Sequence, residues 1–171
     1  IYGFVRIADE MVDSFHDYDK AFLCGKLEED LKDALEHKIS LNPILNSFQY
    51  TVNKYNIPQE MIDAFMKSMR LDLSKSEYKT TEEYQEYIYG SADVVGLMCL
   101  KVFVNGNEEK YNELKDSAMR LGSAFQKVNF LRDLKADFEE LSRTYFPNTD
   151  LSRLDETSKQ QIIAEIQADF D

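Results

Sequence analysis

Two pairs of aspartates in this sequence share one spacing. Asp9 and Asp13 are four residues apart, and so are Asp133 and Asp137. On a helix, residues at this spacing lie one above the other, and two like charges there destabilise the helix by about 0.2–0.5 kcal/mol. Apolar residues recur with helical periodicity around both pairs. The repeated spacing therefore predicts two helical faces that hold a cation between their carboxylates.

Each pair of aspartates belongs to a longer polar stripe on its helix. The residues of each stripe follow one another at steps of three or four, so they stay on one face. The stripes comprise Tyr2, Arg6, Asp9 and Asp13 in the first helix, and Gly122, Gln126, Asn129, Asp133 and Asp137 in the second. A basic residue, Arg6 or Arg132, lies in or beside each stripe. Two matched faces of this kind can line one cavity.

This arrangement suits the ionisation of a diphosphate ester. Mg²⁺ prefers near-octahedral oxygen coordination and usually takes one or two carboxylates together with water and phosphate oxygens. Arginines add charge-assisted hydrogen bonds to the phosphates. The metal ions stabilise the negative charge that builds on the leaving diphosphate. Mg²⁺ is therefore the expected cofactor, with Mn²⁺ as an acceptable substitute.

The allylic carbocation that such a step leaves behind needs an apolar pocket with little water. The segment YQEYIYGSADVVGLMCL can supply one, because small side chains on one of its faces leave room beside the backbone. That face comprises Ile88, Ala92, Val95, Gly96 and Cys99. Tyr87 and Tyr89 add aromatic rings that can stabilise a nearby cation.

Plainer interpretations of these residues stay open. A single pair of aspartates four residues apart is common by chance, and most such pairs lie on a solvated helix face. Gly90 and Gly96 are more typical of close helix packing than of ligand space, and Tyr87 and Tyr89 are more typical of a core. The presence of two matched stripes favours the functional interpretation of the aspartates.

The elements that must position these residues are helices. Glycine and proline are scarce, with six and three residues among 171, and an apolar period of three to four residues runs through nearly the whole chain. Pro43 and Pro58 are predicted first-turn prolines, Thr80 and Glu83 a capping box, and Asn107 an N-cap. We expect one all-α domain without strands, with helices at about 1–18, 20–38, 43–56, 59–73, 82–104, 108–142 and 157–170.

The composition excludes several classes of function. A formal charge of −12 argues against a nucleic-acid partner, because phosphate backbones are bound by basic surfaces. Cys24 and Cys99 have no paired spacing, which indicates a reducing compartment and neither a disulfide framework nor a zinc site. The longest apolar run, Val94 to Leu100, is far too short to span a bilayer. A cytoplasmic location is therefore expected.

Both ends of the sequence lie within helical patterns. The chain starts at Ile1 and stops at Asp171 without a capping or breaking residue at either end. We therefore expect residues 1–171 to be the central part of a single catalytic helical domain in a longer polypeptide.

Several motifs, in order along nearly the whole chain, resemble the squalene and phytoene synthases, the head-to-head isoprenyl diphosphate synthases. YGFVRIADEMVD is similar to the first aspartate-rich segment of that family, and GSAFQKVNFLRDLKAD to the second. MRLDL and YIYGSADVVGLM resemble the segments between them, and RTYFP resembles the short motif that follows. The chain departs from the family pattern at several positions. Gly90 stands where many members carry a bulkier residue, and Asp93 where many carry glycine. One residue more than usual separates Asp137 from Arg143, and Ser142 stands where glycine often precedes that arginine.

The resemblance implies an all-helical isoprenoid-synthase fold in which the two aspartate-rich helices face each other across a central cavity. It implies that two prenyl diphosphates are joined to a cyclopropylcarbinyl diphosphate, which ionises again and rearranges to a linear hydrocarbon. By motif position, Mg²⁺ would be bound by Asp9, Asp13, Asp133 and Asp137, diphosphate by Arg6, Gln126, Asn129, Arg132 and Tyr145, and the prenyl tunnel would be lined by Tyr87, Ala92, Val95 and Gly96.

Within this family, the motifs look most like those of bacterial phytoene synthases, which act on two geranylgeranyl diphosphates without NADPH. A squalene or dehydrosqualene synthase acting on farnesyl diphosphate is the alternative. Product insolubility makes peripheral association with a membrane surface an open possibility for the parent chain. From a different class, the chain could be a non-catalytic helical module whose acidic faces bind cations or a basic partner.

Overall fold

Every regular element that the structure describes is a helix. A computed structural model describes residues 1–139, 145–147 and 156–170, and it gives the side chains of all of these except residues 134–139. The elements are α1 (Tyr2–Asp13), α2 (Lys20–His37), α3 (Pro43–Tyr55), α4 (Gln59–Asp72), α5 (Thr81–Ile88), the π-helix η1 (Tyr89–Asp93), α6 (Val94–Phe103), α7 (Glu108–Glu139) and α8 (Glu156–Phe170). The expected all-α class is confirmed.

Side-chain caps fix most of the predicted helix starts. The carboxamide of Asn42 accepts hydrogen bonds from the first amides of α3, with Pro43 as the first helical residue. The hydroxyl of Thr80 accepts from the amide of Glu83, as predicted, whereas the Glu83 carboxylate accepts from the amide of Lys79. Asn107 caps α7 as expected. Pro58, predicted in a first turn, is instead the residue before α4.

The first helix is shorter than the sequence pattern predicts. It was expected over 1–18 and ends at Asp13. Asp19 takes an extended backbone to cap α2, where its carboxylate accepts from the amide of Phe22 at 2.9 Å. The ammonium of Lys20 donates to the carbonyl of Val12 at 2.8 Å and satisfies the end of α1. These two contacts make residues 14–19 a connection rather than a helix.

The helix expected over 82–104 is interrupted by the π-helix η1. Gly90 lies where η1 crosses α4, and a β carbon at this position would be 2.1 Å from the Ser68 hydroxyl and 2.5 Å from the Ala64 carbonyl oxygen. The wider π turn changes which residues face the neighbouring helices. The helix expected over 108–142 is described as far as Glu139, and residues 140–142 lie outside the described part of the chain.

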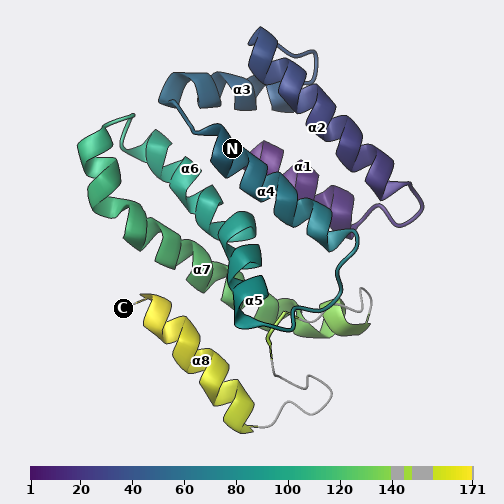
Figure 1. Ribbon diagram of the computed structural model, residues 1–171, viewed down its shortest axis with the longest axis vertical. Helices are drawn as coiled ribbons and strands as arrows, with labels where there is room; N and C mark the ends of the chain where they lie inside the picture. Colours follow the sequence, from purple (N-terminus) through teal and green to yellow (C-terminus); the bar gives the residue numbers. More distant parts are fainter. Residues whose placement is uncertain (140–144, 148–155, 171) are drawn as a thin grey trace.

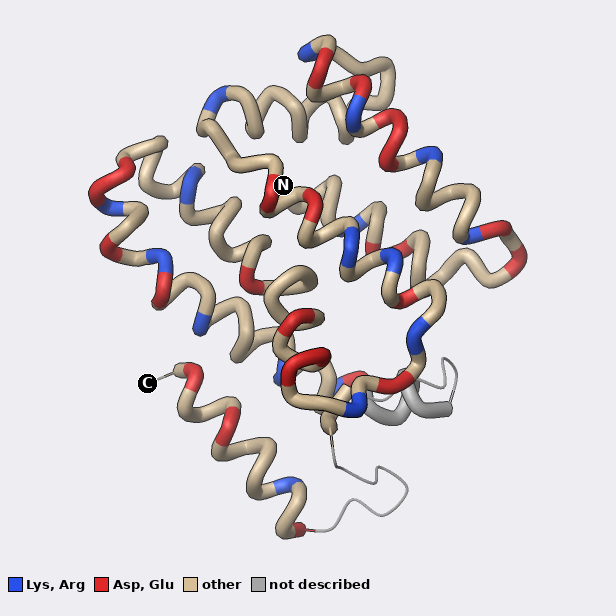
Figure 2. Tube along the Cα trace, viewed as in Figure 1, with Lys and Arg blue, Asp and Glu red and all other residues tan. Residues whose placement is uncertain are grey.

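The helices bring η1 against both α4 and α7, near the middle of the fold (Figure 1). A tight turn with Asn105 and Gly106 in the left-handed region joins α6 to α7, which run side by side. α1 contacts α2, α3 and α4, while α8 lies along α7. Acidic positions occur on helices throughout the fold (Figure 2).

Two groups of buried side chains stabilise this arrangement. The larger group is mainly aliphatic, with a few aromatic rings such as the stacked pair Phe4 and Phe48. It joins the helices α1, α2, α3, α4 and α6. The smaller one is rich in aromatic rings and joins α5, α7, α8 and residues 145–146; it comprises Tyr78, Tyr84, Tyr87, Ile88, Phe130, Tyr145, Phe146, Ile162 and Ile166. We call this second group the aromatic cluster. The candidate site lies between the two groups.

Among the described residues, no helix combines the length and the apolar character that crossing a membrane requires. Cys24 and Cys99 are both free thiols, as their spacing predicts.

Candidate active site

The polar stripes of α1 and α7 line one cavity of about 210 Å³. It contains most of the side chains that the sequence patterns single out, together with Asp72 of α4 and Phe130 of α7. Its lining comprises Arg6, Asp9, Asp13, Asp72, Tyr87, Gln126, Asn129, Phe130, Arg132, Asp133 and Tyr145. Four carboxyl groups and two guanidinium groups therefore meet in one space, which we call the polar cavity.

A second cavity, of about 260 Å³, shares part of this lining and has a more apolar wall. We call it the second cavity. Both cavities are lined by Arg6, Asp9, Tyr87, Gln126 and Asn129. The second cavity adds Tyr2, Val5, Phe65, Met69 and Ser91. A charged space thus opens beside one that keeps these shared residues and adds a wall of mainly hydrocarbon and aromatic side chains.

On α1, the carboxylates are balanced by one arginine. The guanidinium of Arg6 donates to Asp9 at 2.9 Å and also to Glu10. Burial and the neighbouring charge of Asp13 raise the pKa of Asp9, and Arg6 only partly offsets this. The Asp9 carboxylate is therefore a site where added positive charge is favourable.

On α7, the stripe presents one carboxylate and two amides to the same space. Arg132 donates to Asp133 at 2.7 Å, and this hydrogen bond lowers the pKa of Asp133. The amide of Gln126 donates to the hydroxyl of Ser91 at 3.3 Å, and its oxygen accepts from Asn129 at 3.4 Å. These contacts orient the Gln126 side chain between η1 and the next turn of α7.

Aromatic rings form the wall beside the carboxylates. Tyr87 is buried and its hydroxyl donates to Asp72 at 2.7 Å. Burial, then the neighbouring charge of Asp72, raise the pKa of Tyr87 well above its usual range. Phe130 and Tyr145 stack with centroids 4.1 Å apart and rings 8° from parallel, and Tyr145 lies 5.3 Å from the ring of Tyr87. The wall beside the carboxylates is therefore a stack of buried aromatic rings.

Four further residues were predicted for the site, and three of them line neither cavity. Asp137 is on α7, one turn beyond Asp133, and its side chain is outside the described part of the structure. Ala92, Val95 and Gly96, predicted for the prenyl tunnel, line neither cavity. A β carbon on Gly96 would be 2.8 Å from the carbonyl oxygen of Ala118, so this glycine permits close packing of α6 on α7. Val95 packs against the larger core.

Asp72, Ser91 and Phe130 are among the lining residues that the sequence patterns missed. Asp72 belongs to the MRLDL motif. It continues the helix face of the apolar residues Phe65 and Met69, and an acidic residue on such a face is a signal that could have identified it. Ser91 reaches Gln126 because η1 is a π-helix, which an α-helical period does not predict. The sequence patterns did not distinguish Phe130 from an aromatic residue of an ordinary core.

The donor set suits a hard cation. Carboxylate and amide oxygens are the ligands that Mg²⁺ prefers, and Mg²⁺ commonly uses only one or two protein carboxylates. In the described residues, no group of three or more aspartate, glutamate, histidine or cysteine side chains is close enough to hold a metal ion by itself. The residues therefore fit an ion that completes its coordination with water and phosphate oxygens, and they do not form a complete protein cage.

Comparison with known proteins adds an independent line of evidence. A family profile described as squalene/phytoene synthase matches residues 1–169. The chain belongs to the squalene/phytoene synthase family. The expectation from its motifs is thus confirmed, and members of this family are prenyltransferases that act on prenyl diphosphates.

Relatives within the squalene/phytoene synthase family include plant proteins. The chain is 29% identical over 156 residues to phytoene synthase 1, chloroplastic, of Solanum lycopersicum, covering 90% of the chain and 37% of the relative. It is 31% identical over 156 residues to phytoene synthase 2, chloroplastic, of Zea mays, with 90% and 38% covered. The chain thus spans less than two fifths of the length of these relatives.

A solved member of the family shares the fold. The crystal structure of squalene synthase HpnC from Alicyclobacillus acidocaldarius superposes with a TM-score of 0.81 and 25% sequence identity, over 99% of this chain and 68% of that one. The all-helical isoprenoid-synthase fold is therefore confirmed.

Proposed function

We propose that this chain is the central part of the catalytic domain of a phytoene synthase. The reaction would be the Mg²⁺-dependent head-to-head condensation of two geranylgeranyl diphosphates to phytoene. The observation that carries this proposal is the meeting of the α1 and α7 stripes in the polar cavity, with the less polar second cavity directly beside it. Family membership supports the reaction class.

Each polar side chain of the cavity has a role in this proposal. Asp9, Asp13 and Asp133 would bind Mg²⁺, directly or through water, and Asp137 would extend the second set. Arg6 and Arg132 would turn from their present carboxylate partners toward diphosphate oxygens, since both guanidinium groups are at least half exposed. Gln126 and Asn129 would donate amide hydrogen bonds to the same group, and Tyr145 a hydroxyl.

In this reaction, the first carbon–oxygen bond breaks as diphosphate leaves one substrate. The allylic cation is attacked by the double bond of the second substrate, a proton is lost, and a cyclopropylcarbinyl diphosphate forms. Loss of the second diphosphate gives a cation that rearranges and loses a proton to yield phytoene. Bound Mg²⁺ would supply neutralising charge for the leaving diphosphates.

The aromatic wall would stabilise the cationic stages. Tyr87, whose hydroxyl donates to Asp72, would contribute its ring to this wall. Phe130 and Tyr145 present a second, stacked pair of rings. Phe65 and Met69 would exclude water from the prenyl chain on the apolar side.

The choice of phytoene synthase within the family is supported by the names of the relatives, several of which are phytoene synthases. The structural neighbour, by contrast, is named a squalene synthase. The two activities differ in how the last cation is quenched: a phytoene synthase removes a proton, whereas a squalene synthase adds hydride from NADPH. We propose no NADPH requirement here, a cytoplasmic location, and release of the insoluble product at a membrane surface.

Product identification tests this proposal. The protein, expressed from its complete reading frame, is given geranylgeranyl or farnesyl diphosphate with Mg²⁺, with and without NADPH, and hydrocarbons are identified by mass spectrometry. A forty-carbon product formed without NADPH is expected. A thirty-carbon product would reassign the protein to squalene synthase if NADPH is required for reduction, and to dehydrosqualene synthase if it is not.

A second function is favoured by one observation. Arg6 and Arg132 already pair with Asp9 and Asp133, so both faces are stable without a metal ion. A non-catalytic module that binds cations or a basic partner through these faces would have the same pairs. Absence of any hydrocarbon product from protein that binds Mg²⁺ would favour this second function.

A further inference from the structure

A buried lysine joins α7 to α8 on a face of α7 that lines neither of the two cavities. The side chain of Lys127 is 9% exposed, and its ammonium lies 2.6 Å from Glu165 and 2.7 Å from Asp169, both on α8. Burial lowers the pKa of Lys127, but the carboxylates of Asp169 and Glu165 outweigh this and raise the pKa overall. Lys127 therefore stays charged and bound to both carboxylates.

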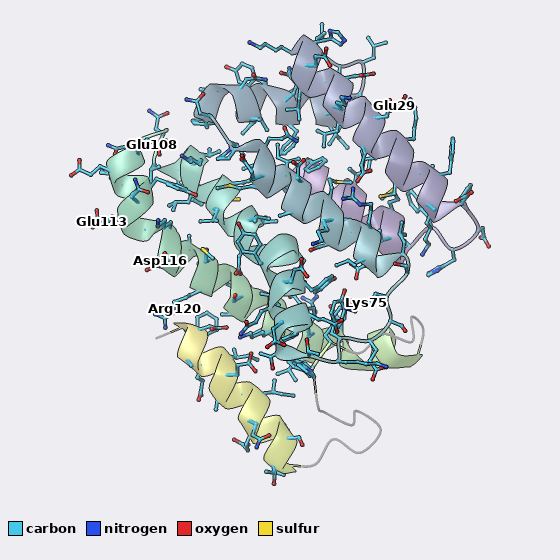
Figure 3. The ribbon with its side chains drawn as sticks, viewed as in Figure 1. Glu29, Lys75, Glu108, Glu113, Asp116 and Arg120 are labelled. Atoms are coloured by element: carbon cyan, nitrogen blue, oxygen red, sulfur yellow. The ribbon has the colours of Figure 1, made fainter. Side chains whose placement is uncertain are left out.

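The same side of α7 is held at two further turns. Arg120 donates to the carbonyl of Ala168, near the end of α8, at 2.6 Å (Figure 3). The hydroxyl of Ser123 donates to Asp93 of η1 at 2.7 Å. Residues 120, 123 and 127 follow one another at helical spacing, so one face of α7 is fixed by polar contacts over three successive turns.

The residues that line the cavities lie on the adjacent face of this helix. Gln126 precedes Lys127 and is turned from it by about 100° around the helix axis. Asn129 and Asp133 continue the face of Gln126. Since a helix with its side chains has a radius of about 5–6 Å, a rotation of about 10° would move these side-chain ends by about 1 Å. Displacements of that size can reduce a rate by about 10²-fold.

The docking of α8 also supports the aromatic wall. Ile162 and Ile166 of α8 pack into the aromatic cluster that contains Phe130 and Tyr145. Loss of the contacts made by Lys127 would loosen the packing of α8 on α7. This would also disturb Phe130 and Tyr145, which line the polar cavity.

We propose that Lys127 is a positioning residue, whose ion pairs with Glu165 and Asp169 fix the rotation at which α7 presents Gln126, Asn129 and Asp133 to the polar cavity. This inference rests on the proposed function of that cavity. Lys127 itself lines neither cavity, so it acts through α7 and not by contact with substrate.

The test compares two buried lysines. Lys127→Met removes the proposed contact, and Lys127→Arg keeps a charge at the same place. Lys101→Met is the matched control, because Lys101 is equally buried and pairs with Glu108 at 2.7 Å at the far end of α7. Binding of inorganic diphosphate in the presence of Mg²⁺ is measured by calorimetry on the full-length protein, alongside helical content and melting temperature.

We expect Lys127→Met to weaken diphosphate binding by about 10- to 100-fold, the range seen when residues that orient metal ligands are removed. Lys127→Arg should restore most of the affinity. Lys101→Met should lower the melting temperature and leave diphosphate affinity unchanged. If Lys127→Met retains wild-type affinity, its role is only structural and the inference is overturned.

A milder variant keeps the test decisive if Lys127→Met does not fold. Glu165→Gln leaves the pair with Asp169 in place and should weaken diphosphate binding by a smaller factor; unchanged affinity would overturn the inference. Wild-type protein that binds no diphosphate would instead overturn the proposed function, and with it the basis of the inference.

Discussion

Replacing the buried carboxylate Asp93 by an amide should change how stability depends on pH. Asp93 is 8% exposed, and its Oδ1 accepts a hydrogen bond from Ser123 at 2.7 Å. Burial raises the pKa of Asp93 from 3.8 to about 6; the nearby charge of Asp169 adds to this, while Ser123 and Lys127 oppose it. Asp93 and Glu165 both line a third cavity, of about 360 Å³, where η1, α7 and α8 meet. Asn at this position keeps an oxygen acceptor for Ser123 and carries no charge.

The sign and the size of the effect follow from the raised pKa. The folded protein holds the Asp93 proton more tightly than the unfolded chain, so stability falls as pH rises from about 4 through about 6 and then levels off. A pKa difference of about 2 units, at 1.36 kcal/mol per unit, corresponds to about 3 kcal/mol. For a domain of this size, that is about 6–12 °C in melting temperature.

Thermal unfolding followed by circular dichroism between pH 4.5 and pH 8 measures this difference. The melting temperature of Asp93→Asn should rise relative to wild type as pH increases, because only wild type must ionise a buried carboxyl. Asp116→Asn, an exposed position on α7, is the control and should follow wild type at every pH. A difference between Asp93→Asn and wild type that does not vary with pH would refute the reasoning.

Three further predictions follow from single contacts. A β carbon on Gly122 would be 2.9 Å from the Ala92 carbonyl oxygen, so Gly122→Ala should lower the free energy of unfolding by about 1–3 kcal/mol. Gly25 has open space around it, so Gly25→Ala should raise the free energy of unfolding by about 0.4–1 kcal/mol. Urea denaturation measures both variants, and equal effects would contradict this prediction. Tyr87→Phe removes the hydrogen bond to Asp72 and should cost about 1–3 kcal/mol in the same assay, and no loss would mean that this bond adds nothing. Mg²⁺ with inorganic diphosphate at a hundredfold excess over its Kd should stabilise the protein by about 2.7 kcal/mol, an effect that EDTA should abolish and that a purely structural role of the acidic faces does not predict.

Most of the helical framework was predictable from local sequence signals. The caps at Asn42, Thr80 and Asn107 fix helix starts through contacts within a few residues, which a sequence displays directly. The end of α1 was not predictable by periodicity, because the helical pattern continues past Asp13 while Lys20 and Asp19 favour a connection. The decision there depends on contacts between two helices.

The candidate site was predictable where its residues share a helix face. The stripes containing Asp9 and Asp133 do line one cavity, since helical spacing fixes which side chains point the same way. Asp72 reaches that cavity, and Ser91 reaches the neighbouring one, through the crossing of α4, η1 and α7, which depends on the π turn and on Gly90. Such contacts arise from tertiary packing and leave no periodic signal.

The central claim is that the α1 and α7 carboxylates act together on one diphosphate, and paired substitutions test it most directly. Turnover of geranylgeranyl diphosphate with Mg²⁺ is measured for Asp9→Asn, Asp133→Asn and the control Asp116→Asn, each expressed from the complete reading frame and checked for helical content. The account predicts a loss of about 10²-fold or more in each of the first two variants with the fold retained, and wild-type turnover in the control. Wild-type turnover in both Asp9→Asn and Asp133→Asn would contradict it.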